Sequence, residues 1–382
     1  MMVVRATAWR GEPADAYERW AGLETRAAEE LDAALDRAAA EIRSGGGELA
    51  ARLAAIELPA AVPLAGTRVP ARAPSAPVRA PDRPASAAQR DRENRARLAA
   101  DLRAAPPGPR RRTLETIDAR LRDLGRGGAT VQLFEYDPGA FGGDGAVAVA
   151  IGDLDTARTI GVVVPGMGTT AASIGAVTRN AVNLQAAARR ADPTTATATL
   201  AWIGYDAPSG RTAVAQVLTG AHARRGAAEL RADLADLARM RPDDPRVVVF
   251  GHSYGATTAA TAGAGGALAG TVDAMVLFGA PGTGPVRAAA ELGMPVFVAR
   301  DSDDPVARVG ATDGAAQGLR RLFGVELGLG MDPAAPSFGA TEVDAEAPTG
   351  LGMAAHSGYF DEGSRALDAF ATILTGGGPH AR

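Results

Sequence analysis

The 382-residue sequence contains no cysteine, no lysine and only four histidines, and each absence excludes a kind of chemistry. Without cysteine the chain forms no disulfide, no cysteine-ligated zinc site and no thiolate nucleophile. Without lysine it has neither the phosphate-binding lysine of a P-loop nor an amine for a Schiff base. An imidazole-dependent reaction therefore has four candidates, which are His222, His252, His356 and His380.

Charge and hydropathy favour neither a nucleic acid nor a lipid bilayer as a partner. The 40 basic residues are balanced by 44 acidic ones, so the net charge is −4 and there is no basic field for phosphate backbones. The N-terminus lacks the apolar run of a secretion signal, and no stretch approaches the roughly 20 apolar residues of a membrane span. We expect no nucleic-acid partner, no membrane span and a cytoplasmic location, and the sequence offers no support for export by a specialised route.

Glycine and proline, with 47 and 25 copies, divide the chain into segments of different composition. Near the N-terminus apolar residues recur every three or four positions, which predicts a long amphipathic helix. A stretch rich in Pro, Ala and Arg follows, and it has too few large apolar side chains to order itself. The expected organisation is a helical segment, a linker, a helical lead-in, a catalytic domain and a flexible tail, at residues 1–57, 58–86, 87–126, 127–376 and 377–382.

Beyond Gly128 short apolar runs alternate with alanine-rich helical stretches, which is typical of a parallel sheet covered by helices on both faces. The expected strands are 131–136, 146–151, 159–164, 197–203, 246–250, 273–278, 295–299 and 340–344. The expected helices between and after them are 172–189, 213–239, 254–268, 285–291, 314–323 and 361–374. The alternation predicts a doubly wound, mostly parallel α/β fold with its functional groups at the carboxyl ends of the strands.

One motif lies in a context that gives it chemical meaning. Residues 251–255 read Gly-His-Ser-Tyr-Gly, after the apolar run 247–250 and before the small residues 256–264. A strand, a tight turn and a helix in this order form a nucleophile elbow, whose strained turn exposes the hydroxyl of Ser253. The flanking glycines let strand and helix approach each other closely. An ordinary glycine-containing turn between strand and helix is the alternative interpretation.

A serine nucleophile needs an imidazole base, and the imidazole needs a carboxylate to orient it. In folds with such an elbow the triad residues follow one another along the chain as serine, acid and histidine, which leaves His356 and His380 as candidate bases. His380 lies in the glycine-rich tail, so we expect His356 to be the base, with a capping or surface-loop histidine as the alternative. His252 precedes the elbow serine, and we expect it to be packed or hydrogen-bonded there.

The acid of the triad is expected in a loop that follows a strand between Ser253 and His356. The expected strand 295–299 leads into Arg-Asp-Ser-Asp-Asp-Pro, which offers three carboxylates. Asp304 is favoured because the proline after it stiffens the turn. Asp301 and Asp303 remain alternatives, although these two carboxylates could instead cap a helix or pair with an arginine.

The oxyanion of an acyl-transfer reaction needs two backbone N–H donors. One is expected from Tyr254, the residue after the nucleophile, and the other from Met167 in the Pro-Gly-Met-Gly turn that follows the strand 159–164. The same turn also matches the Gly-x-Gly-x-x-Ala fingerprint of dinucleotide-binding proteins. No Asp or Glu lies between 156 and 191, however, so the ribose-binding acid expected there is missing.

A second polar segment follows the expected strand 197–203. Residues 202–208 read Trp-Ile-Gly-Tyr-Asp-Ala-Pro and should lie at the rim of the site. Tyr205 and Asp206 are therefore candidates for the substrate cleft. The alternative is that Asp206 caps a turn and Trp202 belongs to the core.

Taken together, these motifs resemble the actinobacterial α/β-hydrolase family long catalogued as a domain of unknown function. The resemblance covers about 81–360 and rests on the segments 89–95, 164–169, 202–208, 251–255 and 356–359, the last of which reads His-Ser-Gly-Tyr. It implies an α/β-hydrolase fold and an esterase-like serine hydrolase with Ser253, Asp304 and His356 as its triad. Met167 stands where a smaller residue is expected, which affects the pocket shape but not the backbone donor.

The N-terminal Trp9-Arg10-Gly11 and the helix after it resemble the second half of a WXG-type helical hairpin, found in small proteins linked to type VII secretion. Only eight residues precede Trp9, so the first helix of the hairpin would come from a partner or from further N-terminal sequence. Residues 13–42 are thus a candidate docking segment for a helical partner. A plain solvent-facing helix with one buried tryptophan is the alternative.

The sequence predicts a serine hydrolase that cleaves a carboxylic ester or related acyl bond and uses neither a metal nor an organic cofactor. The expected substrate is a small-molecule or lipid-like acyl ester. Two other functions remain open. The first is a catalytically inactive α/β-hydrolase scaffold that binds a partner in type VII secretion, and the second is dinucleotide binding through the glycine-rich turn.

Overall fold

The computed structural model describes residues 84–210, 213, 216–217, 220–310, 329–345 and 352–378. The strands are β1 (Val131–Asp137), β2 (Ala146–Ile151), β3 (Thr159–Val164), β4 (Thr197–Ile203), β5 (Arg246–His252), β6 (Ala274–Phe278), β7 (Val296–Ala299) and β8 (Thr341–Val343). The α-helices are α2 (Ala87–Ala104), α3 (Pro109–Arg126), α4 (Ile174–Ala191), α6 (Ala221–Met240), α7 (Tyr254–Gly263), α8 (Pro305–Gly310), α10 (Met353–Ser357) and α11 (Arg365–Leu374). Short 3-10 helices are η1 (Phe141–Gly143), η2 (Ala171–Ser173), η4 (Ala264–Gly266), η5 (Ala289–Leu292) and η6 (Gly358–Phe360).

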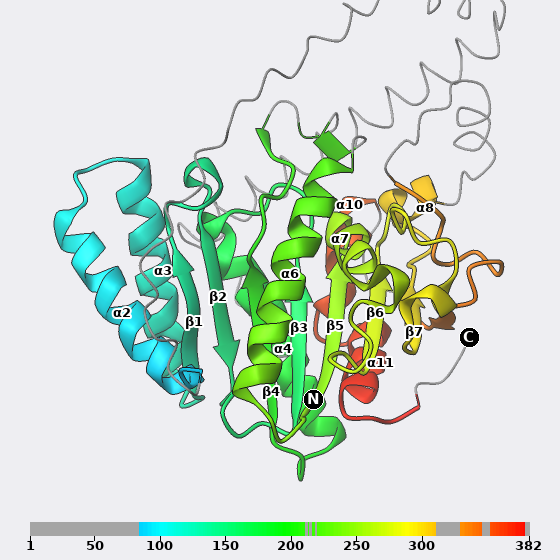
Figure 1. Cartoon of the computed structure of the whole chain (residues 1–382), viewed down its shortest axis with the longest axis horizontal. Helices are drawn as coiled ribbons and strands as arrows, with labels where there is room; N and C mark the ends of the chain where they lie inside the picture. Colours follow the sequence, from blue (N-terminus) through cyan, green and yellow to red (C-terminus); the bar gives the residue numbers. More distant parts are fainter. Residues whose placement is uncertain are drawn as a thin grey trace, which may run out of the picture.

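All eight strands form one sheet in the order β1-β2-β4-β3-β5-β6-β7-β8 (Figure 1). Strand β2 runs antiparallel to β1 and β4, and the remaining neighbours are parallel. This order and these directions define the α/β-hydrolase fold. The mostly parallel sheet predicted from the sequence is confirmed, with every strand within two residues of its expected ends.

Helices cover both faces of the sheet, which explains why its strands are apolar throughout. In β5 the side chains of Val247 and Val249 join one core, and those of Val248 and Phe250 join the other. Helices α6 and α7 lie on the first face, while α3, α4 and α11 lie on the second (Figure 1). The two cores hold the carboxyl ends of the central strands in place at one edge of the molecule.

The lead-in helix α2 packs against the edge strand β1 and satisfies its backbone. The carboxylate of Asp91 accepts the N–H of Leu133 at 2.7 Å, and the amide of Asn94 donates to the carbonyls of Leu133 and Phe134 at 2.9 and 3.1 Å. The pairing of β1 with β2 shifts register between Leu133 and Glu135, so these carbonyls lie at an irregularity. The edge strand is thereby protected from pairing with another chain.

Two expected helices differ from the observed ones for local reasons. The helix expected at 254–268 ends at Gly263, because Gly265 and Gly266 adopt φ of 67° and 75°. The helix expected at 285–291 is only the short η5, since the chain there bonds to a neighbouring loop, with Ala289 N donating to Phe338 O. The helix expected at 213–239 is interrupted at Gly220, whose φ is 61°: residues 213, 216 and 217 are helical, and α6 begins after the glycine. Helix α11 begins after Ser364, later than the expected start at 361.

Several predictions concern residues outside the described ranges. These are the N-terminal helical segment with its tryptophan motif, nearly all of the linker, the helix at 314–323, and most of the tail. Among the residues that the structure describes, no helix combines the length and the apolar character needed to cross a bilayer.

Candidate active site

Ser253 lies at the sharp turn between β5 and α7. Its backbone adopts φ 54° and ψ −129°, a region that a residue with a side chain occupies only under strain. Close packing enforces the turn, because a Cβ on Gly255 would lie 2.4 Å from the carbonyl oxygens of Val164 and Pro165. The N–H of Ser253 donates to the carbonyl of Phe278 at 3.0 Å, which ties the turn to β6.

His356 and Asp304 form a buried pair, although they are 52 positions apart in the sequence. The Nδ1 of His356 is 3.0 Å from Oδ1 and 2.9 Å from Oδ2 of Asp304. Asp304 precedes α8, and its Oδ1 also accepts the N–H groups of Val306 and Ala307. Burial by itself raises the pKa of Asp304, but His356 and the hydrogen bonds bring this pKa to about 2. The carboxylate is therefore charged across the working pH range.

The other two candidate acids are engaged elsewhere. Asp301 accepts the N–H of Asp303 at 2.8 Å through its Oδ1. The side chain of Asp303 is 44% exposed and lies 3.5 Å from Arg308. Of the three carboxylates it is Asp304 that the structure places against the Nδ1 of His356.

The elbow and the histidine meet at the end of β6. A Cβ on Gly279 would lie 3.0 Å from the Nδ1 and Cε1 of His356, and the residue before it accepts the N–H of Ser253. On the other side, the Nε2 of His252 is 2.8 Å from the carbonyl oxygen of His356. Ser253 and the His356–Asp304 pair therefore both lie at the carboxyl end of β6, and their action as a triad stays a prediction.

The glycine-rich turn after β3 packs directly on the elbow. A Cβ on Gly166 would lie 2.7 Å from the Cβ of Ser253 and 3.1 Å from its Oγ. The N–H of Gly168 is used by the carbonyl of Pro208, at 2.8 Å. Within the described part of the chain the N–H groups of Met167 and Tyr254 donate no hydrogen bond. Their expected role as oxyanion donors stays a prediction.

Tyr205 does not line a cleft, and this prediction is wrong. Its side chain is 1% exposed, its ring stacks on Trp202 at 5.8 Å, and its hydroxyl donates to the carbonyl of Pro165 at 2.8 Å. Because Pro165 begins the glycine-rich turn, Tyr205 supports that turn from below. Asp206 is partly exposed, with its carboxylate 3.3 Å from the Nδ1 of His222, and its role at the cleft stays a prediction.

Sequence reasoning gave no individual role to Tyr359, and only its place in the His-Ser-Gly-Tyr segment pointed to it. Its hydroxyl lies 2.7 Å from the Oδ2 of Asp304. The sequence also predicted that His252 lies beside the elbow, but it did not identify the His356 carbonyl as the partner of His252. Spacing carried a signal in both cases: one residue lies three positions after the candidate base, and the other precedes the nucleophile.

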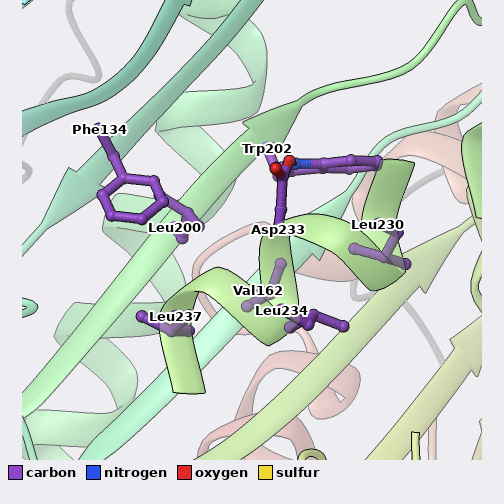
Figure 2. A pocket seen from close by; sticks show the side chains of 8 residues that line it. All are labelled: Phe134, Val162, Leu200, Trp202, Leu230, Asp233, Leu234 and Leu237. Atoms are coloured by element: carbon purple, nitrogen blue, oxygen red, sulfur yellow. The ribbon is translucent and has the colours of Figure 1, made fainter. Parts of the chain in front are cut away.

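A small cavity lies elsewhere, between the sheet and α6 (Figure 2). Its walls include Phe134, Trp202 and Leu230, with the carboxylate of Asp233 as a polar group, and that carboxylate accepts the indole N–H of Trp202 at 2.7 Å. The volume of about 10 Å³ is that of a single water. This cavity is too small to hold a substrate. Among the described residues no group of three or more His, Asp or Glu is arranged to hold a metal ion.

The strand order defines an α/β-hydrolase fold, and the match to a family model agrees with it. Residues 141–313 match the model of an alpha/beta hydrolase family. The resemblance predicted from the sequence is thus confirmed for the hydrolase region.

The curated relatives are mycobacterial proteins. An uncharacterized protein of Mycobacterium tuberculosis is 40% identical over 283 residues, which cover 70% of this chain and 42% of the relative. An uncharacterized protein of Mycobacterium bovis is 36% identical over 144 residues, or 36% of this chain and 52% of the relative. The chain therefore spans about half or less of the length of the curated relatives it matches.

Solved structures with a similar chain trace include esterases. An esterase of Mycobacterium marinum is 13% identical, with a TM-score of 0.38 over 77% of this chain and 97% of that chain. An esterase of Pyrobaculum calidifontis is 14% identical, with a TM-score of 0.37 over 73% of this chain and 97% of that chain.

Proposed function

We propose that this protein is a serine hydrolase that cleaves a carboxylic ester, or a related acyl bond, through an acyl-enzyme intermediate. The observation that carries the proposal is the convergence of a strained serine, a buried histidine–carboxylate pair and two free N–H groups at one edge of the sheet. This combination is the one that acyl transfer requires. The substrate class is a small-molecule or lipid-like acyl ester.

In the first step the Oγ of Ser253 attacks the acyl carbon while the Nε2 of His356 takes the hydroxyl proton. Asp304 accepts the Nδ1–H of His356, which fixes the tautomer and stabilises the imidazolium as it forms. The N–H groups of Met167 and Tyr254 bind the oxyanion of the tetrahedral intermediate. Its collapse releases the alcohol, which receives the proton from His356.

In the second step a water molecule attacks the acyl-enzyme. His356 takes a proton from that water, the oxyanion forms again in the same two-donor site, and the ester bond to Ser253 breaks. The acid product leaves, and the serine hydroxyl regains its proton from His356. Neither step requires a metal or an organic cofactor.

Covalent labelling tests the proposal. A fluorophosphonate probe should label the wild-type protein and fail to label Ser253→Ala and His356→Ala. Ser302→Ala is the matched control, because this serine is exposed in the loop before Asp304, and it should label like the wild type. A panel of acyl esters of graded length then defines the substrate. Folded wild-type protein that neither labels nor hydrolyses any ester would contradict the proposal.

The alternative is a catalytically inactive scaffold that binds a partner through the N-terminal helix. The strained backbone of Ser253 favours the enzyme, since a scaffold has no need for such a conformation. A test of the alternative is binding of a partner helix to residues 13–42 in the full chain, with Ser253→Ala expected to bind as the wild type does.

A further inference from the structure

The hydroxyl of Tyr359 and the imidazole of His356 converge on the same carboxylate. The phenol oxygen is 2.7 Å from the Oδ2 of Asp304, and the Nδ1 of His356 is 2.9 Å from that oxygen. His356 belongs to α10, and Tyr359 belongs to η6, which follows without a break. One short helical segment therefore carries both groups that contact the acid.

The direction of the hydrogen bonds around the phenol is fixed. The N–H of Asp301 donates to the phenol oxygen at 3.0 Å, and a charged carboxylate can only accept, so Tyr359 donates its proton to Asp304. Burial, followed by the charge of Asp304, raises the pKa of Tyr359 well above its usual value, so the donor keeps its proton at every working pH. The ring is 1% exposed and packs edge-on against Phe278 at 5.3 Å.

We propose that Tyr359 is a positioning residue that holds the carboxylate of Asp304 and shares its negative charge, so that the phenol tunes how strongly His356 binds a proton. The inference rests on the proposed function, in which His356 is the base. A donor on Oδ2 withdraws charge from the carboxylate and weakens its hold on the imidazolium. Loss of the donor should therefore make His356 more basic.

Besides Asp304 and His356, the titratable groups that face this cluster are His252 at the end of β5 and Asp301 before α8. Burial, and then the neighbouring His356, lowers the pKa of His252 to about 3, so this ring is uncharged above pH 4. Because His252 stays uncharged, a change in the protonation of the His252–His356 pair is assigned to His356.

The test compares Tyr359→Phe with Tyr136→Phe, which removes an equally short bond of 2.7 Å from a buried tyrosine to Asp101, between β1 and α2. For Tyr359→Phe we expect kcat on an acyl ester to fall roughly tenfold with KM within about twofold, as for the loss of a hydrogen bond to a charged group. The acidic limb of the kcat/KM profile should move up by about half a pH unit to one unit. Tyr136→Phe should leave kcat and the limb unchanged.

A second measurement does not depend on turnover. The Cε1–H signals of the four histidines are titrated by NMR, with His356→Ala to assign the signal. The midpoint of His356 should rise in Tyr359→Phe by the same amount as the kinetic limb. If the wild type hydrolyses no ester but this midpoint moves, the proposed function fails and the inference stands. If hydrolysis is normal and neither limb nor midpoint moves, Tyr359 only packs, and the inference is overturned.

A further variant covers the case in which Tyr359→Phe does not fold. Difluorotyrosine at position 359 keeps the shape of the side chain but makes the phenol a stronger donor. The acidic limb and the His356 midpoint should then move down instead of up. Unchanged values in a folded difluorotyrosine protein would likewise overturn the inference.

Discussion

His252 and His356 lie against each other, with ring centroids 4.6 Å apart, and the Nε2 of the first is 2.8 Å from the backbone oxygen of the second. Because burial, followed by the nearby His356, lowers the pKa of His252 to about 3, its ring is neutral above pH 4 and Nε2–H donates to that oxygen. The residue before Ser253 therefore fixes the backbone of the candidate base.

Replacement of His252 tests this contact. His252→Phe keeps an aromatic ring but loses the donor, and we expect kcat to fall roughly tenfold because the His356 carbonyl loses the hydrogen bond from His252. The acidic limb of the pH profile should stay in place, because His252 is uncharged there. His252→Gln can place an amide N–H near the Nε2 position and should recover part of the loss. Full activity in His252→Phe together with a loss in His252→Gln would contradict the contact and show that only ring packing matters.

Gly166 sets the distance between the glycine-rich turn and Ser253. A Cβ in Gly166→Ala would lie 2.7 Å from the Cβ of Ser253, so turn or serine must shift. A displacement of about 1 Å at a reacting group costs on the order of 100-fold, and we expect kcat/KM to fall by this factor. Gly175→Ala is the control, because its added Cβ meets nothing within 4 Å and kcat/KM should not change. A fully active Gly166→Ala would contradict the packing argument.

Tyr205 supports the same turn through the carbonyl of Pro165. Tyr205→Phe leaves this buried carbonyl unpaired, and the free energy of unfolding should drop by about 1–2 kcal/mol. Since the turn carries the N–H of Met167, kcat should also fall several-fold while KM stays nearly constant. Urea denaturation and ester kinetics measure the two effects. Tyr136→Phe, which loses a hydroxyl bond far from the elbow, should lower stability without lowering kcat.

Glu135 on β1 links stability to pH. Burial, and after it the charge of Asp233, raises the pKa of Glu135 from 4.5 to about 8. The folded protein thus holds a proton on Glu135 that the unfolded chain loses near pH 4.5. The stability that this protonated side chain contributes is complete below pH 4.5 and is lost as pH rises towards 8. At about 1.4 kcal/mol per pKa unit, Glu135→Gln should be up to about 5 kcal/mol more stable than the wild type at pH 8.5 and equally stable at pH 4.

The control for this prediction is Glu115→Gln. Glu115 is 52% exposed and pairs with Arg111 on α3, so its replacement should change the unfolding free energy by less than about 0.5 kcal/mol at any pH. Thermal or urea unfolding at pH 4, 6 and 8.5 measures the difference. A stability gap between Glu135→Gln and wild type that does not widen with pH would contradict the assignment.

The sequence alone determined the positions of the strands and of the elbow, because both depend on local patterns. An apolar run of five to seven residues bounded by glycine or proline forms a buried strand wherever helices cover both faces. Glycines on either side of Ser253 are needed by the turn itself, and Gly255 shows this in its contact with Pro165.

Only the tertiary structure decided which side chains meet across distant segments. Three aspartates in one loop are equivalent in a pattern, and the choice of Asp304 depends on how α8 and α10 pack on the sheet. The burial of Tyr205 and the bond from Tyr359 to Asp304 depend on the same packing. Such contacts join residues far apart in the chain, whose distances are set by the folded cores and not by their spacing in the sequence.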